Sequence, residues 1–535
     1  MERDRAPGAL WDVIVIGAGL CGSVAADVLS RDGHRVLVLE AGQTPHSVGP
    51  GKRGLLARIR HKLLGSTLLY PGRWNGQMKV NLTTASGRKR NMRFPAFLGT
   101  GPGGGSLIYG AALGRFQRDD FTRNASEDPE AFDNSWPLDW AAFLPWYTAA
   151  EQLMQVHGSP DPTDPDDNGG ALTPPPPLGP RDAAFADCLA ANGRNPFRLR
   201  VGFQYRPGCS ECLGIPCPRG CKSDGFSRCL GPALAAGRVT LRTKARVTGI
   251  TDDGTTLTVQ IKDETPDAPE LSQQFCARHV VLAAGALQTP RLLHHAPDLF
   301  PDGRPSPLLG RGLMFHGADI FAVFDPEGRA EYGPRKTLGF RDHYRDQTAP
   351  LGEVQSVGLP ITTGTVTGFL IDEAKRRGFS WMGRGLQLLR FPAMVGVRMF
   401  RNATLFATNL EDFPSPQNRV IVTAEDDEIA VAYQVSPDMA RRGAALRAHI
   451  RAAFAPWRVI FLSTPDTPNW GHPTGTCRMG TDPETSVTTP DGQLWGNDRV
   501  TVLDTSVFPS SAGANPSLTA VANALRISCG LRARL

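Results

Sequence analysis

Gly17-Ala18-Gly19-Leu20-Cys21-Gly22 joins an apolar stretch, residues 12–16, to a run of small apolar residues, 21–30. In such a loop the first glycine allows a tight turn, the second lets backbone approach a pyrophosphate, and the third lets a helix pack closely on a strand. A strand over 12–16, a helix over 21–30 and a second strand over 34–39 form one strand–helix–strand unit. The free N–H groups at the helix start favour a phosphate. The sequence therefore predicts a Rossmann-like dinucleotide site.

An acidic residue stands where this site needs one. Glu40 ends the second predicted strand, 18 residues after Gly22, and Ala41 follows it. A carboxylate at this distance accepts hydrogen bonds from ribose hydroxyls. No arginine follows Glu40 closely, which disfavours the 2′-phosphate of NADP. This region alone leaves NAD and FAD both open.

Composition limits the class of protein. The chain has 535 residues, which predicts two or three domains, and 41% hydrophobic and 21% charged residues, as in globular proteins. The net charge of +6 comes without a basic stripe or binding motif, so we expect no nucleic-acid partner. No apolar stretch precedes the first strand, and no run approaches the ~18 apolar residues that span a bilayer. We expect a cytoplasmic protein that is not transmembrane.

The rest of the chain divides into recognisable segments. Residues 43–95 are basic and irregular, and 158–180 is a Pro/Asp/Gly-rich loop. Alternation predicts a hairpin over 238–261, and 320–465 carries short strands and a few helices of a second, mixed domain. Buried strands are predicted at 280–284 and 500–504, and a closing helix at 516–531.

The C-terminal part holds the most specific motif. Residues 472–480 read His-Pro-Thr-Gly-Thr-Cys-Arg-Met-Gly, and 513–519 read Gly-Ala-Asn-Pro-Ser-Leu-Thr. With the glycine fingerprint, and with stretches 103–107, 284–290, 310–314, 418–420 and 502–509, they resemble the glucose–methanol–choline (GMC) oxidoreductase family, which binds FAD. The resemblance covers nearly the whole chain.

The resemblance implies a fold as well as a cofactor. It implies a mixed α/β protein in which a discontinuous Rossmann-like FAD-binding domain comprises 1–45, 95–120, 225–318 and 466–535. A substrate-binding domain, an antiparallel sheet backed by helices, would comprise 46–94, 121–224 and 319–465. Some relatives attach FAD through a histidine in the glycine loop. Residues 104–109 contain none, so we expect non-covalent FAD.

Site residues follow from the resemblance at matching positions. His472 matches the catalytic histidine, and Asn515 matches the position that holds His or Asn. Asp504 resembles a residue that faces the ribityl and pyrophosphate region, and Val247 matches backbone that meets adenine. The cofactor-binding residues expected in all are Gly17, Gly19, Leu20, Cys21, Gly22, Glu40, Ala41, Gly104, Gly105, Ser106, Tyr109, Val247, Ala284, Asp504, Asn515 and Pro516.

The reaction asks for these residue types independently. Oxidising an alcohol removes the hydroxyl proton and passes the hydride of the carbon to flavin N5. Histidine suits the proton because its pKa lies near neutrality. An amide such as Asn515 can hold the same oxygen by a hydrogen bond, and positioning the carbon over the flavin supplies much of the rest.

Ten cysteines are unevenly spread, and five lie between Cys209 and Cys229. The order Cys209-x2-Cys212-x4-Cys217-x3-Cys221 resembles a segment of family sugar dehydrogenases that ligates an iron–sulfur cluster and relays electrons to a haem subunit. Four thiolates at short spacing equally suit zinc. Disulfides and free thiols stay open as well, since ferredoxin-type spacings are tighter and more regular.

The substrate and the electron acceptor stay open. Residues 351–400 mix apolar and basic side chains; a pair of amphipathic helices with a solvated basic face is favoured over a lid or a docking surface. Family substrates include sugars and polyols, long-chain or aromatic alcohols, and sterols. The acceptor is oxygen, a quinone or a redox protein. Rival hypotheses are an NAD-dependent dehydrogenase and a flavoprotein without catalysis.

Overall fold

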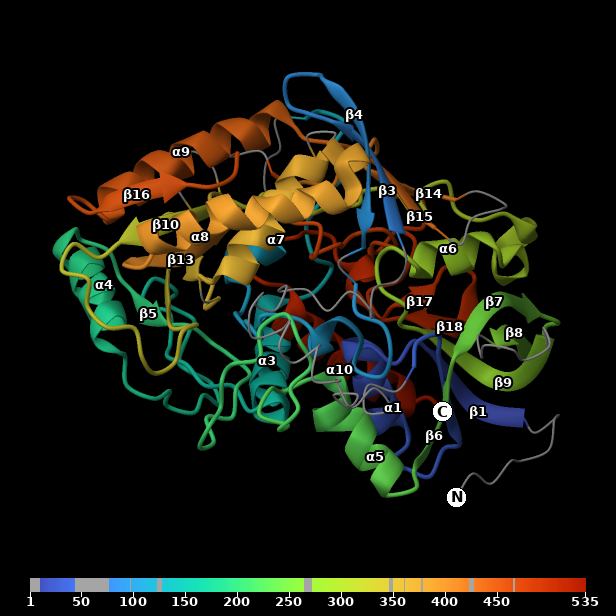
Figure 1. The fold of residues 1–535 in the computed structure, drawn as a ribbon. Helices are drawn as coiled ribbons and strands as arrows, with labels where there is room; N and C mark the ends of the chain where they lie inside the picture. The colour runs from blue at the N-terminus through green and yellow to red at the C-terminus, as the bar shows by residue number, and fades with distance from the viewer. Residues whose placement is uncertain are drawn as a thin grey trace.

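The computed structural model describes residues 10–43, 77–96, 98–122, 128–263, 272–345, 350–359, 361–376, 379–422, 428–464 and 467–535. Three sheets organise these residues, as Figure 1 shows. The fold is mixed α/β, as predicted. No helix in these ranges is long and apolar enough to cross a membrane. The predicted domain boundaries stay a prediction.

The first sheet is built on the glycine fingerprint. Its strands run in the order β17-β18-β9-β1-β2-β6, and β18, β9, β1, β2 and β6 are mutually parallel. Residues 13–16 of β1 and all of β2 are buried, as expected of central parallel strands. The strands are β1 (Leu10–Ile16), β2 (Val36–Glu40), β6 (Val239–Thr243), β9 (Ser272–Leu282), β17 (Gln493–Leu494) and β18 (Asn497–Val502).

A hairpin extends this sheet. Strands β7 (Ala245–Asp252) and β8 (Leu257–Asp263) pair antiparallel, and β8 pairs antiparallel with β9. The hairpin predicted over 238–261 therefore begins later, because β6 pairs with β2 instead.

Helices of small residues pack beside the parallel strands. Helix α1 (Leu20–Leu29) lies against α10 (Ser517–Arg532), and the Cys21 thiol contacts the Ala520 carbonyl at 3.8 Å. The two ends of the chain therefore share one core. The other helices of this half are α3 (Trp140–Met154), α5 (Gly231–Ala235) and α6 (Thr289–His294).

The second sheet is wholly antiparallel, in the order β16-β10-β13-β12-β11-β5. Helices α4 (Pro180–Ala191) and α9 (Pro437–Ala453) share its apolar core; Phe185 meets Phe406 edge to face at 5.5 Å between ring centroids. The strands are β5 (Phe197–Arg198), β10 (Ile320–Phe324), β11 (Leu338–Phe340), β12 (Glu353–Ser356), β13 (Ala403–Asn409) and β16 (Arg458–Phe461).

The third sheet corrects one prediction. Strands β3 (Gln77–Thr83) and β4 (Lys89–Pro95) form a hairpin. Strand β3 pairs in parallel with β15 (Ile429–Gln434), and β15 pairs antiparallel with β14 (Arg419–Ile421). Residues 77–95 are thus not irregular: Met78, Val80 and Leu82 alternate with polar residues and are buried. The rest of the predicted irregular stretch, apart from residue 43, lies outside the described residues.

A helical insertion lies between two strands of the second sheet. Between β12 and β13 the chain forms α7 (Thr363–Arg376), a 3₁₀ segment (Phe379–Leu389) and α8 (Arg390–Met399). Two helices are therefore present in the segment predicted to hold a pair. Several of its large apolar side chains are exposed, among them Leu388 and Phe391, which the prediction of a solvated basic face did not include.

Two glycines let the second sheet meet the C-terminal segment. A Cβ on Gly513 would stand 2.5 Å from the Gly352 Cα, and one on Gly352 would overlap the Asn409 carbonyl oxygen. The Glu353 N–H donates to the Gly513 carbonyl at 2.9 Å, just beyond this contact. The close approach sets how β12 lies against the segment that carries Asn515.

Replacing Gly352 by alanine should destabilise the fold more than replacing Gly87. Both glycines are left-handed, with φ near +78° and +79°, which costs alanine about 1–2 kcal/mol. Gly87 has open space, whereas Gly352 adds a steric cost of about 1–3 kcal/mol. Urea unfolding of Gly352→Ala and Gly87→Ala measures the difference. Equal losses would contradict the close approach.

Candidate active site

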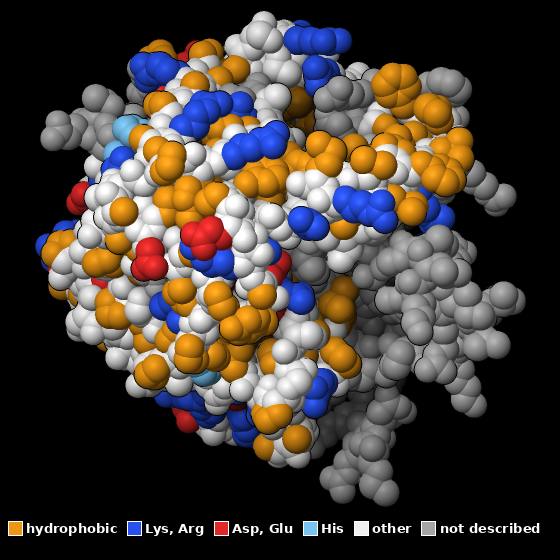
Figure 2. Space-filling view, turned by 60° about the vertical axis from the view of Figure 1, so that its left-hand side comes forward, with side chains coloured by type: hydrophobic (Ala, Val, Ile, Leu, Met, Phe, Trp, Pro, Cys, Tyr) orange, Lys and Arg blue, Asp and Glu red, His pale blue; other side chains and the backbone are white. Residues whose placement is uncertain are grey.

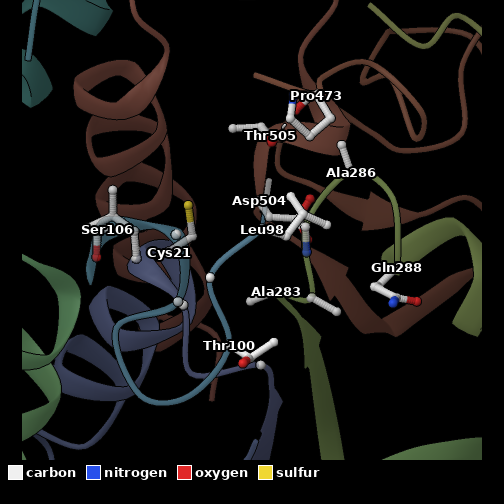
Figure 3. Close-up of a pocket in the computed structure, with 18 of the residues that line it drawn as sticks. Cys21, Leu98, Thr100, Ser106, Ala283, Ala286, Gln288, Pro473, Asp504 and Thr505 are labelled. Carbon is white, nitrogen blue, oxygen red and sulfur yellow. Dashed lines mark hydrogen bonds between the residues drawn. The ribbon is translucent and has the colours of Figure 1, made fainter. Parts of the chain in front are cut away.

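A cavity of about 450 Å³ lies at the carboxyl ends of the parallel strands. Its wall comes from the loops after β1, β2, β9 and β18, from the start of β7, from the glycine-rich residues 98–110 and from the loop before α10. Figure 3 shows Cys21, Ser106, Ala283, Pro473 and Asp504 around a common space. Predicted site residues in the lining are Gly17, Gly19, Leu20, Cys21, Glu40, Ala41, Gly104, Gly105, Ser106, Tyr109, Val247, Ala284, His472, Asp504 and Pro516. Gly22 and Asn515 lie outside it.

The glycines of the cavity leave room that FAD can fill. No atom lies within 4 Å of a Cβ built on Gly19 or Gly105, so either side chain would project into open space. Gly19 also precedes α1 without a side-chain cap, which leaves the first N–H groups of the helix for a phosphate. Gly22 acts differently, because its Cβ would overlap the Gly17 carbonyl oxygen. The residues present therefore fit a dinucleotide.

Two buried carboxylates brace the loops of the cavity. Glu40 accepts the N–H groups of Ala18, Gly42 and Gly101 at 2.7–3.0 Å. Asp504 accepts the N–H groups of Gly285 and Ser506 at 2.8 Å and the Thr289 hydroxyl at 2.6 Å. Each carboxylate therefore orients the backbone around the cofactor cavity. This role is separate from the predicted hydrogen bonds to hydroxyl groups of the cofactor.

The glycine loop is held from outside the cavity. A 3₁₀ turn, Gly104–Leu107, carries Ser106, whose hydroxyl donates to the Gly103 carbonyl at 2.5 Å. The buried Lys222 ammonium donates to the carbonyls of Leu107, Cys212 and Ile215, each at 2.8 Å. Lys222 thus ties the cysteine-rich segment to the loop that lines the cavity.

His472 meets a second histidine that the sequence analysis missed. The Nδ1 atoms of His472 and His316 are 3.1 Å apart, and the rings stand at 89°. His316 is fully buried, and its Nε2 lies 3.1 Å from the Ser511 carbonyl oxygen. His316 follows the stretch 310–314, which resembles the GMC family, by two residues. This position was the one feature of the sequence that could have pointed to His316 as a site residue.

The contact with His316 favours one tautomer of His472. The Ser511 carbonyl can only accept, so a neutral His316 carries its proton on Nε2 and offers a lone pair at Nδ1. His472 then donates from Nδ1, and its Nε2 is left with a lone pair. Asn469 Nδ2 also lies 3.1 Å from His472 Nδ1, and Asn469 Oδ1 accepts the Gly471 N–H at 3.1 Å. A proton on His472 Nδ1 therefore requires the Asn469 amide to exchange its two ends and give up the hydrogen bond from Gly471.

The surroundings keep both rings neutral. Burial lowers the pKa of His316 to about 4. Burial also holds the pKa of His472 well below its ordinary 6.5, helped by His316 and by the ammonium of Lys336. Lys336 is itself buried, which lowers its pKa to about 8 although Glu353 and Glu211 act in the opposite direction. His472 is therefore neutral at neutral pH.

Asn515 is oriented by two amides of the antiparallel sheet. Its Oδ1 accepts from Gln355 Nε2 at 2.7 Å and from Asn409 Nδ2 at 3.2 Å, which leaves its own Nδ2 to donate. The buried Gln355 Oε1 has no partner among the described residues. Asn515 and His472 make no direct hydrogen bond to each other. The segment 511–516 nevertheless contacts His316 through Ser511, and the antiparallel sheet through Asn515.

The cysteine segment forms a thiol cluster. The Cys212 thiol contacts Cys217, and together with backbone N–H groups it holds the pKa of Cys217 below its ordinary value. All ten cysteines are described, and all are free thiols in this structure. The described residues contain no group of His, Cys, Asp or Glu arranged to hold a metal ion, which leaves iron–sulfur and zinc ligation by Cys209, Cys212, Cys217 and Cys221 without support.

Comparison with known proteins agrees with this geometry. The profile described as GMC oxidoreductase matches residues 179–316 and 414–524, and an NAD(P)-binding Rossmann-like profile matches 15–52. The chain belongs to the GMC oxidoreductase family. It is an FAD-dependent alcohol oxidoreductase.

Relatives of this GMC oxidoreductase match it over nearly its whole length. It is 27% identical to paromamine 6′-oxidase of Streptomyces fradiae over 97% of this chain and 90% of that one. It is 29% identical to 6‴-hydroxyparomomycin C oxidase of Streptomyces lividus, over 98% and 92%. The fold resembles formate oxidase of Aspergillus oryzae, with TM-score 0.65 and 15% identity over 99% of both chains.

Filling the cavity without disturbing the fold should release the cofactor. Gly19→Ala places a methyl group in the cavity and should lower the flavin content, while the stability of the apoprotein changes by about 1 kcal/mol or less. Gly22→Ala should instead destabilise the apoprotein by overlap with Gly17. Flavin absorbance per protein and thermal unfolding of both variants separate the two effects. A Gly19→Ala protein with full flavin content would contradict the placement.

Proposed function

We propose that this oxidoreductase oxidises a hydroxyl group of a neutral sugar-like or polyol alcohol to the carbonyl, with His472 as the base. The observation that carries the proposal is a buried imidazole, His472, that lines the FAD cavity and contacts a second buried histidine through its Nδ1. When bound, FAD supplies the acceptor for the hydride of the alcohol carbon. We further propose that it binds non-covalently, since residues 104–109 contain no histidine.

His472 takes the hydroxyl proton at Nε2 in this proposal. Its Nδ1–H donates to His316, whose own proton is held by Ser511, so the ring cannot offer the wrong nitrogen. A fixed tautomer keeps the lone pair in place before the alcohol arrives, which is the preorganisation that general-base catalysis needs. His316 is a positioning residue.

Asn515 is proposed to hold the oxygen of the alcohol. The amides of Gln355 and Asn409 occupy its Oδ1, so its Nδ2 is the end left to donate. A hydrogen bond from this donor stabilises the negative charge that grows on the oxygen as the proton leaves. The free Oε1 of Gln355 offers an acceptor for a second hydroxyl of a polyol.

Two observations support the substrate class. The relatives include paromamine 6′-oxidase, 6‴-hydroxyparomomycin C oxidase, a 2-methyl-1,2-propanediol dehydrogenase and a fructose dehydrogenase large subunit. The Lys336 ammonium acts electrostatically on His472, so a cationic group on the alcohol would be repelled close to the base. The relatives support an alcohol with several hydroxyl groups, and the charge of Lys336 favours one without a cationic group beside the reacting carbon.

The acceptor of the electrons is proposed as oxygen, a quinone or a redox protein. We also propose a cytoplasmic location, because ten free thiols without a disulfide suit a reducing compartment.

Anaerobic reduction tests the function directly. Purified protein is mixed without oxygen with a panel of sugars, polyols, aliphatic alcohols and amino sugars, and flavin absorbance is followed. Neutral polyols should bleach the flavin fastest, and re-oxidation by air or by a quinone then identifies the acceptor. Bleaching by NADH but by no alcohol would overturn the proposal.

Removing the base should slow flavin reduction without loss of the cofactor. His472→Ala should lower the rate of anaerobic flavin reduction by about 10²–10⁴-fold, the usual contribution of a general base. His295→Ala, an exposed histidine that follows α6, is the matched control and should keep the wild-type rate. A His472→Ala enzyme with full turnover would contradict the role.

Removing the charge of Lys336 should shift the pH profile. Only neutral His472 accepts a proton, so kcat/KM falls as the pH drops through the pKa of His472. The Lys336 ammonium lowers that pKa. Lys336→Met should therefore raise it and move the acid limb to higher pH. Lys336→Arg keeps the charge and should leave the limb in place; an unchanged limb in both variants would contradict the coupling.

A further inference from the structure

The helical insertion presents a concentrated apolar surface. Its large apolar side chains are 40–68% exposed and make up seven of the ten exposed ones among the described residues. They are Phe379, Met382, Leu388, Phe391, Met394, Val395 and Met399. Figure 2 shows hydrophobic side chains gathered with Lys and Arg at the upper right of the face it presents. We call residues 379–401 the exposed helical segment.

This surface is one face of a folded unit. Leu386 and Ala393 are buried, and a Cβ on Gly396 would stand 3.7 Å from Val366 of α7. The exposed helical segment thus packs on α7 with one side while its largest apolar residues turn outward. Such a patch on a folded protein is a site of interaction.

The charge of the segment selects its partner. Residues 379–401 contain no Asp or Glu and four Arg, namely Arg384, Arg390, Arg398 and Arg401, and Lys375, Arg376 and Arg377 precede them. Arg398 and Arg401 are exposed beside the apolar residues. A second copy of the chain would bring two such cationic segments together, which their mutual repulsion opposes. An anionic surface with an apolar interior attracts both parts.

We propose that the exposed helical segment docks this enzyme on an anionic lipid membrane. Large apolar side chains and arginines on one short helical unit are the features of helices that lie in the membrane interface. Leu388, Phe391 and Met394 enter the boundary between headgroups and acyl chains. Arg398 and Arg401 bind lipid phosphates, where the negative surface potential holds them. The binding is peripheral and reversible.

Vesicle flotation of the FAD-loaded full chain tests the proposal. The protein should float with vesicles of phosphatidylcholine containing about 30% phosphatidylglycerol. It should bind vesicles of phosphatidylcholine alone at least about tenfold more weakly. Raising the salt from 0.1 to 1 M shortens the Debye length from about 10 to about 3 Å, and should weaken the binding.

Matched variants assign the binding to this segment. Phe391→Ser with Met394→Ser should lower vesicle binding about tenfold, whereas Tyr332→Ser, which alters a 64% exposed side chain elsewhere, should not change it. Arg398→Glu with Arg401→Glu should lower binding to anionic vesicles only. All variants alter exposed side chains and should reduce flavin with a soluble alcohol at the wild-type rate.

Three results would overturn the proposal. They are no flotation with anionic vesicles, equal flotation of the Phe391/Met394 and Tyr332 variants, and a concentration-dependent dimer in light scattering that Phe391→Ser abolishes. The last would assign the surface to a second copy. Saturable binding of an acidic protein without vesicle binding would assign it to a protein partner.

Discussion

Two imidazole rings meet edge to face between the parallel and antiparallel sheets, and burial keeps both uncharged. This contact orders the rest of the site. His316 lies just before β10. Its Nε2 proton is held by the carbonyl oxygen of Ser511, which lies in the segment before α10. With its Nδ1 proton donated to His316, His472 keeps its lone pair at Nε2, and the residue lines the cavity. A charged ring here would have no lone pair to offer.

The two halves of the molecule serve this contact in different ways. The parallel sheet shapes a cofactor cavity almost entirely from backbone, with glycines that leave room and with Glu40 and Asp504 bracing loops. The antiparallel sheet supplies side chains, as Gln355 and Asn409 orient Asn515. The Gly352–Gly513 approach joins the two halves two residues before Asn515. The exposed helical segment lies in the connection between β12 and β13 of the antiparallel sheet.

Local patterns were predictable and dispersed ones were not. The Gly17–Gly22 loop was predictable because its three glycines act within one turn. Glu40 was predictable from its distance along the chain to Gly22, and His472 from the contiguous motif 472–480. His316, Gln355 and Lys336 are single residues on strands or beside them, and only the antiparallel sheet brings them together. The cysteine spacing suggested a metal, whereas folding leaves free thiols. The apolar residues of the exposed helical segment showed a helical period, but which face turns outward depends on the packing with α7.

The proposed role of His472 as the base requires a neutral ring whose proton lies on Nδ1. Nitrogen NMR of the enzyme labelled with ¹⁵N-histidine measures this directly, with His472→Gln assigning the signal. At neutral pH we expect one protonated ring nitrogen, Nδ1, and one unprotonated ring nitrogen, Nε2. Two protonated nitrogens, or a proton on Nε2 with a bare Nδ1, would contradict it.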